Sequence, residues 1–321
     1  MQPRFFEKGW VSMLKSMIYK KKSPLIVFLV PAFLFIVLFL YYPFFQNILN
    51  TFLSIGGLGR AAEGFNTPWY ENYVRLFTDP YMRIAMKNTA ILIVCTVVFQ
   101  VGIALVLALL VDSIKHGAQF FRTVYFFPIV LSATALGLMF NLIFLYKGGM
   151  INQLLLKMGF LDYEVKSNGK MIVDWLDWKD KAHFMTTMFM PVMWQYVGFY
   201  FVIIITGINN IPTDLYEAAA LDGADGWKKT RYITIPLLRN VLRTCLVLAI
   251  TGALKVFDLP WVMFGAGMPE NQGWLTGTYM YDQTFNRMNV DYGSTIAVFI
   301  VVLGIILSNV TNRVFKPSED F

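Results

Sequence analysis

The feature that most constrains this chain is a series of long apolar runs separated by polar segments. A helix that crosses a bilayer core needs about 20 apolar residues, and six runs reach that length, near 25–45, 88–111, 124–146, 184–207, 237–263 and 292–312. Only 15% of the 321 residues are charged, against about 25% in soluble domains. The sequence therefore predicts an all-α integral membrane protein with six transmembrane helices.

Basic residues are distributed unequally between the two sets of polar segments. The N-terminal segment, 112–123, 208–243 and the C-terminal tail hold 15 Lys and Arg against 8 Asp and Glu, whereas the other connections hold 11 against 11. Because short basic loops remain in the cytoplasm, the first set and both termini are expected there. The net charge of +7 is then a sign of membrane topology and does not indicate a nucleic-acid partner.

The expected organisation is one membrane domain with short flanking segments. Residues 1–24 place an apolar residue at every fourth position beside several lysines, which predicts a cytoplasmic amphipathic helix lying on membrane lipid. Residues 25–313 would form the transmembrane domain, and 314–321 a cytoplasmic tail. The outer segments 46–87 and 147–183 contain several aromatic residues and are expected to be small folded caps.

The most polar part of the second half runs from Glu217 to Asn240, between the fourth and fifth apolar runs. A helix-forming string over 215–221 is followed by Asp222-Gly223, and a second string over 227–235 stops before Pro236. Glycine and proline at these places are ordinary helix-end signals. We therefore expect two short helices joined at Gly223 in the cytoplasmic loop 208–236, with small alanines that allow close approach to another surface.

No set of side chains in the sequence indicates catalysis or a metal site. Cys95 and Cys245 lie in separate apolar runs, and His116 and His183 have no second His or Cys at ligand spacing. The motifs G-x-x-x-x-G-K-[ST], H-E-x-x-H and G-x-S-x-G are absent from the sequence. We expect a non-catalytic membrane subunit that binds no cofactor of its own.

The Glu217 stretch resembles the coupling motif of a known transporter family. E-A-A-x-x-D-G-A followed by I-x-I-P is similar to the cytoplasmic motif of permease subunits in binding-protein-dependent ABC importers. Further matches in the same order, among them Arg122-Thr123-Val124 and Val256–Trp261, resemble the sugar-permease branch, which includes maltose and glycerol-3-phosphate permeases. The resemblance covers the chain from about Pro24 to Arg313.

This resemblance implies an ABC importer type I permease core in a bacterial cytoplasmic (inner) membrane, paired with a second, homologous permease subunit. Two ABC ATPase subunits, which would bind ATP and Mg²⁺, would lie below, and an extracytoplasmic binding protein would deliver a saccharide. By position in the motif, the residues expected to contact an ATPase are Glu217, Ala218, Ala219, Asp222 and Gly223. The residues alone leave open a self-contained secondary carrier or a channel.

The resemblance also implies a substrate path near the middle of the membrane. Aligned without gaps from Gly223, the sugar-contacting positions of the maltose-type relative in the fifth run fall at Ala249, Ala253 and Val256. Those before the motif fall near Val192 and Tyr196, and those after Pro128 near Ile129 and Ala133. Several of these residues are apolar, which argues against maltose itself. From the residues alone, Trp194, Gln195 and Tyr196 suit a saccharide, and Asn141 is a candidate for hydrogen bonding between helices or for the path.

Lys255 and Asp258 are charged residues inside the fifth apolar run. An ionisable group within the membrane costs at least about 2.5 kcal/mol on insertion scales. If the run is one helix, Asp258 lies three residues on, on the same face as Lys255. Two interpretations follow: an ion pair between these residues, or a Lys255 that faces the path and attracts an acidic or strongly polar saccharide.

Overall fold

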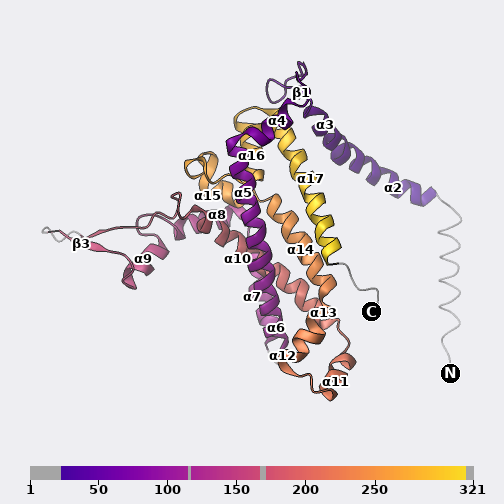
Figure 1. Cartoon of the computed structure of the whole chain (residues 1–321), viewed down its shortest axis with the longest axis vertical. Coiled ribbons are helices and arrows are strands. Elements are labelled where there is room, and N and C mark those ends of the chain that lie inside the picture. Colours follow the sequence, from indigo (N-terminus) through magenta and orange to yellow (C-terminus); the bar gives the residue numbers. More distant parts are fainter. Residues whose placement is uncertain (1–22, 115–116, 167–170, 316–321) are drawn as a thin grey trace.

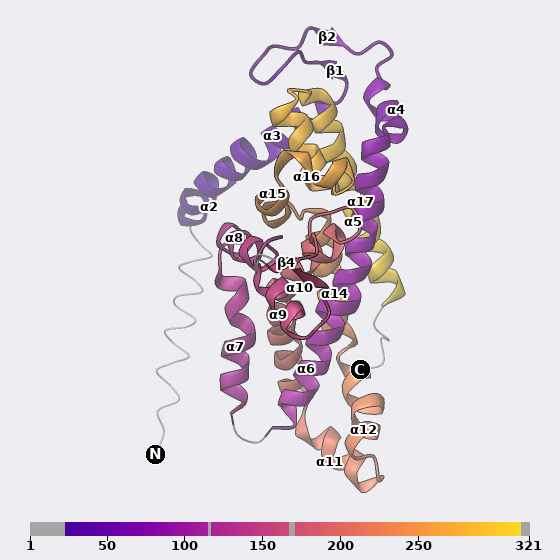
Figure 2. The ribbon, with the colours of Figure 1, turned by 90° about the vertical axis from the view of Figure 1, so that its left-hand side faces the viewer.

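The computed structural model describes residues 23–114, 117–166 and 171–315, and within them the chain is mostly helical. Figures 1 and 2 show an elongated helical bundle. The short strands β1 (Leu53–Ser54) and β2 (Gly64–Phe65) lie at one end, and helices α11 (Thr213–Leu221) and α12 (Gly226–Lys229) lie at the other. The amphipathic helix predicted over 1–24 and the tail at 314–321 fall almost wholly outside the described residues.

Among the described residues, five helical segments are long and apolar enough to cross a membrane: Ile26–Asn50, Pro80–Asp112, Phe184–Asn209, Arg239–Phe264 and Val290–Val314. Each contains one of the predicted runs, or nearly all of it. A sixth span exists only if a sharply bent helix pair is counted as one. The all-helical membrane fold is therefore confirmed, whereas the count of six spans is reached only with that pair.

Two spans, Ile26–Asn50 and Pro80–Asp112, are assembled from α-helical pieces joined by a π-helical turn. The helices of the spans, together with the bent pair and the turns that lead into the fifth span, are, in chain order, α2 (Ser23–Ile36), η1 (Val37–Tyr41), α3 (Tyr42–Asn50), α5 (Pro80–Cys95), η2 (Thr96–Val101), α6 (Gly102–Asp112), α7 (Ala118–Val130), α8 (Ala133–Ile143), α10 (Phe184–Asn209), η3 (Thr230–Thr234), α13 (Ile235–Leu237), α14 (Arg239–Leu254), α15 (Asp258–Phe264) and α17 (Val290–Val314).

The run near 124–146, expected to form one transmembrane helix, is not a single helix. This run is divided between α7 and α8, which are bent by 95° relative to each other. The backbone is extended at Leu131 and Ser132, and the Ser132 hydroxyl accepts a hydrogen bond from the amide of Ala135 at 3.2 Å. A serine in this position starts a new helix by satisfying one of its free amides, and hydropathy alone does not register that cap.

The fifth span is also interrupted, at residues 255–257. Helix α14 ends at Leu254, α15 starts at Asp258, and Phe257 between them has non-helical torsion angles (φ −141°, ψ −58°). Gly277 packs against the break, because a β-carbon there would lie 2.8 Å from the carbonyl oxygen of Val256. Lys255 and Asp258 therefore do not share a helical face, and no ion pair joins them within the described part of the chain.

The two long connections expected to be folded caps, and the connection after α15, contain secondary structure. Segment 46–87 carries the antiparallel β1–β2 pair and α4 (Glu71–Thr78). Segment 147–183 carries α9 (Met150–Lys157) and the antiparallel pair β3 (Tyr163–Val165) and β4 (Met171–Val173). The connection after α15 contains η4 (Gly265–Gly267), η5 (Pro269–Asn271), α16 (Thr276–Tyr281) and η6 (Asp282–Asn286).

A partly buried carboxylate contact fixes α5, α16 and α17 to one another at the β1–β2 end. The Asp79 Oδ2 atom accepts hydrogen bonds from the hydroxyls of Tyr279 at 2.6 Å and Tyr292 at 2.9 Å. The Arg75 guanidinium lies 4.0 Å from the centre of the Tyr292 ring. Burial, followed by the bond to Asp79, raises the pKa of Tyr279, so its hydroxyl remains a hydrogen-bond donor.

Candidate functional site

A cavity of about 320 Å³ lies where η2, α10, α14 and the break before α15 meet. Helix α10 is extensively buried and packs against η2 and α14, which places its side chains on this wall. The structure brings nine of the predicted path residues together around the cavity: Ala133, Val192, Gln195, Tyr196, Ala249, Ala253, Lys255, Val256 and Asp258. These residues come from three separate apolar runs, so their grouping is a result of the fold.

Three predicted path residues lie elsewhere. Trp194 lines a different, apolar cavity of about 920 Å³ between α7 and α10. The Asn141 side chain donates a hydrogen bond to the carbonyl of Val262 at 3.4 Å and so connects α8 with α15, which is the inter-helix role anticipated for it. Ile129 lies half-buried in the last turn of α7 and is not on the wall of the 320 Å³ cavity.

The amides on the cavity wall also hold the helices around it in place. Gln100 on η2 donates to the carbonyl of Val192 at 2.9 Å, and Gln195 on α10 donates to the carbonyl of Leu131 at 3.4 Å. Gln100 was not among the predicted residues, although a glutamine in the middle of an apolar run points to a buried polar contact. Because each amide nitrogen has a further N–H, these residues can still bind a ligand.

The cavity wall carries one cationic and one anionic side chain, Lys255 and Asp258, and both are exposed. Tyr196 contributes an aromatic ring that is 38% exposed, and Phe257, which the motif analysis did not single out as a path residue, contributes a second. Hydroxyl, amide, charged and aromatic groups around a concave space of this kind suit a polar ligand with apolar ring faces.

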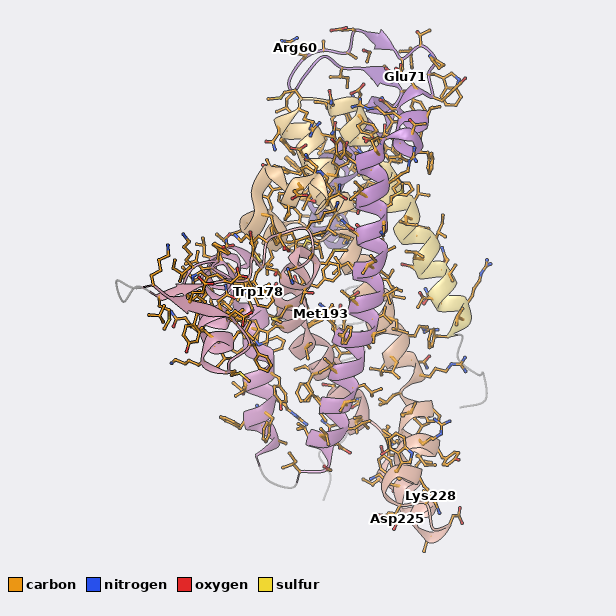
Figure 3. The ribbon with its side chains drawn as sticks, turned by 60° about the vertical axis from the view of Figure 1, so that its left-hand side comes forward. Arg60, Glu71, Trp178, Met193, Asp225 and Lys228 are labelled. Atoms are coloured by element: carbon orange, nitrogen blue, oxygen red, sulfur yellow. The ribbon has the colours of Figure 1, made fainter. Side chains whose placement is uncertain are left out.

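A second candidate functional element lies at one end of the bundle. It is the hairpin formed by α11 and α12, which projects from the bundle with Asp225 and Lys228 at its tip (Figure 3). Helix α11 ends in two characteristic hydrogen bonds, from Ala224 N–H to Ala219 at 2.8 Å and from Gly223 N–H to Ala220 at 3.1 Å. Gly223 has a φ of 73°. This is a Schellman helix end, in which glycine provides the left-handed residue, and the predicted turn at Gly223 is confirmed.

Four of the five predicted coupling residues are exposed, namely Glu217, Ala218, Asp222 and Gly223, whereas Ala219 is buried. Two apolar side chains that were not predicted are also exposed here, Leu221 at 90% and Trp227 at 69%. A leucine directly before Asp222-Gly223 is the sequence signal for this exposure, since it falls at the tip of the turn. The hairpin thus presents apolar and acidic groups together.

The second helical string does not stop before Pro236 as predicted. It continues from α12 through the π-helical η3 into α13, which contains Pro236 in its first turn. A proline inside a continuous helix removes one backbone hydrogen bond, and here the π-helical η3 directly before α13 replaces the regular α-helical pattern. The hairpin is consequently joined to α14 by nearly continuous helix.

A protein-family model and individual relatives both match most of this chain. A family model described as "Binding-protein-dependent transport system inner membrane component" matches residues 101–320. The Bacillus subtilis "Probable ABC transporter permease protein YurN" is 33% identical over 92% of this chain and 96% of its own length. The "Lactose transport system permease protein LacF" of Rhizobium radiobacter is 28% identical over 88% of this chain and 90% of its own.

A solved structure shares the fold. One chain in the crystal structure of a bacterial ABC transporter involved in the import of the acidic polysaccharide alginate superimposes with a TM-score of 0.78 at 19% identity, covering 96% of this chain and 100% of that chain. The fold is thus that of an ABC importer type I permease, and the family predicted from the Glu217 motif is confirmed. This multi-pass membrane protein belongs to the family of binding-protein-dependent transport system inner membrane components.

Proposed function

We propose that this chain is the permease subunit of an ATP-driven importer and forms half of the path for an oligosaccharide or a related saccharide. The observation that carries the proposal is the position of the cavity relative to the hairpin. Helix α14 supplies Ala249 and Ala253 to the cavity wall, and its other end is joined through α13 and η3 to the hairpin. A displacement of the hairpin therefore acts directly on the wall of the path.

The saccharide assignment rests on the chemistry of the cavity and on the relatives. Gln195, Tyr196 and Asp258 offer hydrogen-bonding groups for hydroxyls. The Tyr196 ring, and the Phe257 ring that packs against Trp261 and Tyr281, provide apolar surface for pyranose rings. The relative LacF is named for lactose transport. A cavity of about 320 Å³ in one subunit accommodates part of an oligosaccharide, which fits a path shared between two permeases.

The hairpin is the proposed docking element for an ATPase on the cytoplasmic side. Exposed Leu221 and Trp227 would enter an apolar cleft, while Glu217 and Asp222 would pair with basic groups around it. The ATPase subunits would bind ATP and Mg²⁺ and perform all hydrolysis, so this chain has no catalytic residues. The excess of Lys and Arg on the segments at this end supports the same orientation in a bacterial cytoplasmic membrane.

The other proposed partners fit the remaining surfaces. Helix α2 projects away from the bundle (Figure 1), whereas α3 packs against α17, and no residue of the central part of the span Ile26–Asn50 is buried. We assign this surface to membrane lipid and the second permease. The β1–β2 end, on the outer side, would receive the loaded binding protein. Binding at that end and ATP binding below would bias the same conformational change, which is coupling between two sites.

Reconstitution tests this proposal. The chain is co-expressed with a second permease, the ATPase and the binding protein, and uptake of a saccharide panel into liposomes is measured with and without ATP. The expected result is uptake that requires ATP and all partners. Uptake by this chain alone without ATP would instead identify a secondary carrier or a channel.

A further inference from the structure

The break between α14 and α15 places the Lys255 side chain beside the cavity, and no ion pair within the described part of the chain includes it. Lys255 is the residue that follows the last turn of α14, and its side chain is exposed to the cavity. The ion pairs within the described part of the chain are Arg287 with Asp282 and His183 with Asp180, and neither involves Lys255. An ammonium group at membrane depth is expected to have a partner.

The backbone at the end of α14 does not provide that partner. The last carbonyls of a helix can accept hydrogen bonds from a nearby lysine. Here the carbonyl of Gly252 accepts from the amide of Lys255 at 3.0 Å, and that of Ala253 accepts from Val256 at 3.4 Å. The carbonyl of Leu254 accepts from the Thr276 hydroxyl at 3.5 Å. Among the described residues, no hydrogen bond joins the Lys255 ammonium group to these carbonyls, so this group is available to a ligand.

Asp258 is not the missing counter-ion. It opens the first turn of α15, where the positive end of the helix stabilises a carboxylate, and the non-helical Phe257 turns the chain between the two charges. The two side chains do not come within ion-pair distance of each other in the described structure. Lys255 thus has no ion-pair partner in the described structure, although the Asp258 carboxylate lies on the same cavity wall.

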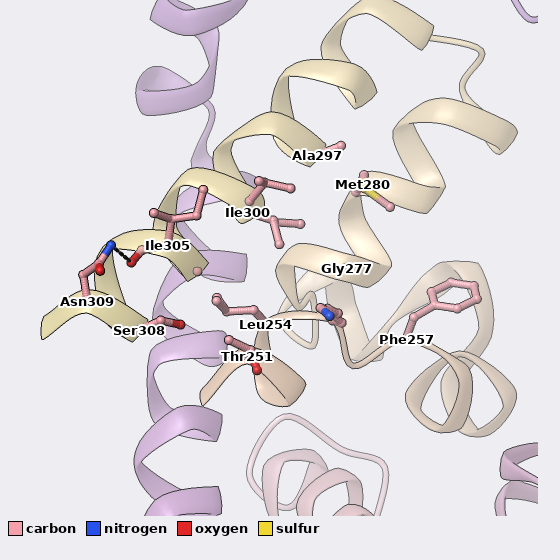
Figure 4. A pocket seen from close by; sticks show the side chains of 13 residues that line it. Thr251, Leu254, Phe257, Gly277, Met280, Ala297, Ile300, Ile305, Ser308 and Asn309 are labelled. Atoms are coloured by element: carbon pink, nitrogen blue, oxygen red, sulfur yellow. Dashed lines mark hydrogen bonds between the residues drawn. The ribbon is translucent and has the colours of Figure 1, made fainter. Parts of the chain in front are cut away.

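Phe257 and Lys255 together line two neighbouring cavities. Both residues line the 320 Å³ cavity and also a second cavity of about 700 Å³ between α14 and α17. Figure 4 shows the second cavity, with Leu254, Gly277 and Phe257 around the break. A cation and an aromatic ring on adjacent sides of one opening can bind a sugar ring and its acidic substituent together.

We propose that the transported saccharide carries an anionic group, such as the carboxylate of a uronate, and that Lys255 binds this group while Phe257 packs against the adjoining ring. The inference rests on the proposed function and adds the charge of the substrate to it. Lys255 is then the residue that determines specificity for acidic over neutral saccharides, and Phe257 contributes to both.

The test uses the complete reconstituted complex with an unchanged binding protein. ATP-dependent uptake is measured for two oligosaccharides of the same linkage, one with a glucuronate and one with a glucose at the same position. The wild type is expected to prefer the acidic sugar. In K255Q, the acidic-to-neutral ratio of uptake should fall by about ten- to hundredfold, the usual effect of losing a hydrogen bond to a charged group.

Three further variants separate the contributions. K255R should keep the acidic preference, because it retains the charge. F257L should lower uptake of both sugars by a similar factor and leave the ratio unchanged. K157Q removes an exposed lysine on α9, away from the cavity, and should leave uptake of both sugars unchanged.

Two outcomes would overturn the inference while leaving the saccharide importer intact. One is a wild-type complex that transports the neutral sugar in preference to the acidic one. The other is an unchanged ratio in K255Q, with assembly of the complex verified by size-exclusion chromatography and K255M measured as a second variant. Absence of ATP-dependent uptake for every saccharide would overturn the proposed function together with the inference.

Discussion

Gly198 on α10 lies directly against the backbone of Tyr125 on α7. A β-carbon at Gly198 would overlap the carbonyl oxygen of Tyr125, and the amide nitrogen of Phe126 lies 3.0 Å from the same point. The Tyr125 ring packs edge-on against Phe201 one turn further along α10, with 5.2 Å between ring centres. A small residue at this crossing is what allows the two helix backbones to approach so closely.

Replacing Gly198 with alanine should therefore destabilise the protein. The added methyl group meets backbone atoms that cannot rotate away, and overpacking of this kind costs about 1–3 kcal/mol. The measurement is thermal unfolding of the purified complex. G102A is the matched control, because a β-carbon at Gly102 of α6 would have no neighbour within 4 Å. Equal stability of both variants would show that α7 and α10 adjust freely.

The exposed leucine at the hairpin tip gives a prediction about coupling. L221A removes an apolar side chain that is 90% exposed in this chain and that, in the proposed complex, is buried against the ATPase. An interface anchor of this type contributes about 2 kcal/mol, so the affinity for the ATPase should fall by more than about tenfold. L58A, at the β1–β2 end, is the control (52% exposed). ATPase affinity that is the same in both variants would argue against docking at Leu221.

The turn at Gly223 gives a separate prediction. A left-handed backbone costs a residue with a β-carbon about 1–2 kcal/mol, and the φ of Gly223 is 73°. G223A should distort the hairpin and reduce ATP-driven uptake while the subunits still assemble. Uptake is compared with co-purification of the ATPase. Simultaneous loss of uptake and assembly would indicate a purely structural role for the turn.

The hydrogen bonds of Asp79 are expected to stabilise the end of the bundle that faces away from the hairpin. Y279F removes a 2.6 Å hydrogen bond to a carboxylate inside the protein, and such bonds contribute about 1.5–3 kcal/mol. The expected result is a lower unfolding temperature and faster proteolysis of segment 265–289. Y163F is the matched control, since Tyr163 lies exposed on β3. A Y279F variant as stable as Y163F would contradict this account.

We expect the local stability of the chain near the start of α10 to depend on pH because of Asp180. Its Oδ1 atom accepts hydrogen bonds from the amides of Ala182 at 3.0 Å and His183 at 2.8 Å, and it lies 2.8 Å from the His183 ring. Burial by itself would raise the pKa of Asp180, but the hydrogen bonds and charge of His183 lower it overall.

A carboxylate with a lowered pKa in the folded state stabilises that state above the unfolded pKa of about 3.9, and this contribution is lost as the pH falls through the folded value. Amide hydrogen exchange at Ala182 and His183, corrected for the intrinsic rate, should therefore accelerate below about pH 4. In D180N the same amides should exchange with little dependence on pH. Identical pH profiles in both proteins would exclude Asp180 as the responsible group.

Much of this protein follows from local features of its sequence. The apolar runs predicted the helical spans because burying about 20 consecutive apolar residues in lipid requires no other part of the chain. The Ala-rich string ending in Asp222-Gly223 predicted the hairpin, since the Schellman end depends only on neighbouring residues. The family assignment depended on the same string.

The breaks within the spans were decided by tertiary structure. Residues 255–257 leave the helix where a distant segment packs against them. The backbone of Gly277 lies close to the Val256 carbonyl, and the Thr276 hydroxyl donates to the Leu254 carbonyl. The hydropathy of the run gives no sign of this, because each residue there is compatible with a helix. The Lys255–Asp258 pair expected for one continuous helix is accordingly not formed.

The sequence by itself determined the membrane class, the approximate spans, the hairpin and the family. Only the tertiary structure decided that Ala133, Gln195, Ala253 and Lys255 share one cavity, and that Trp194 and Ile129 do not. The physical reason is that apolar residues are distributed nearly evenly around a helix that is surrounded by lipid or protein on every side, so the sequence does not mark one face as buried. The direction in which each side chain points is then set by which helices pack together.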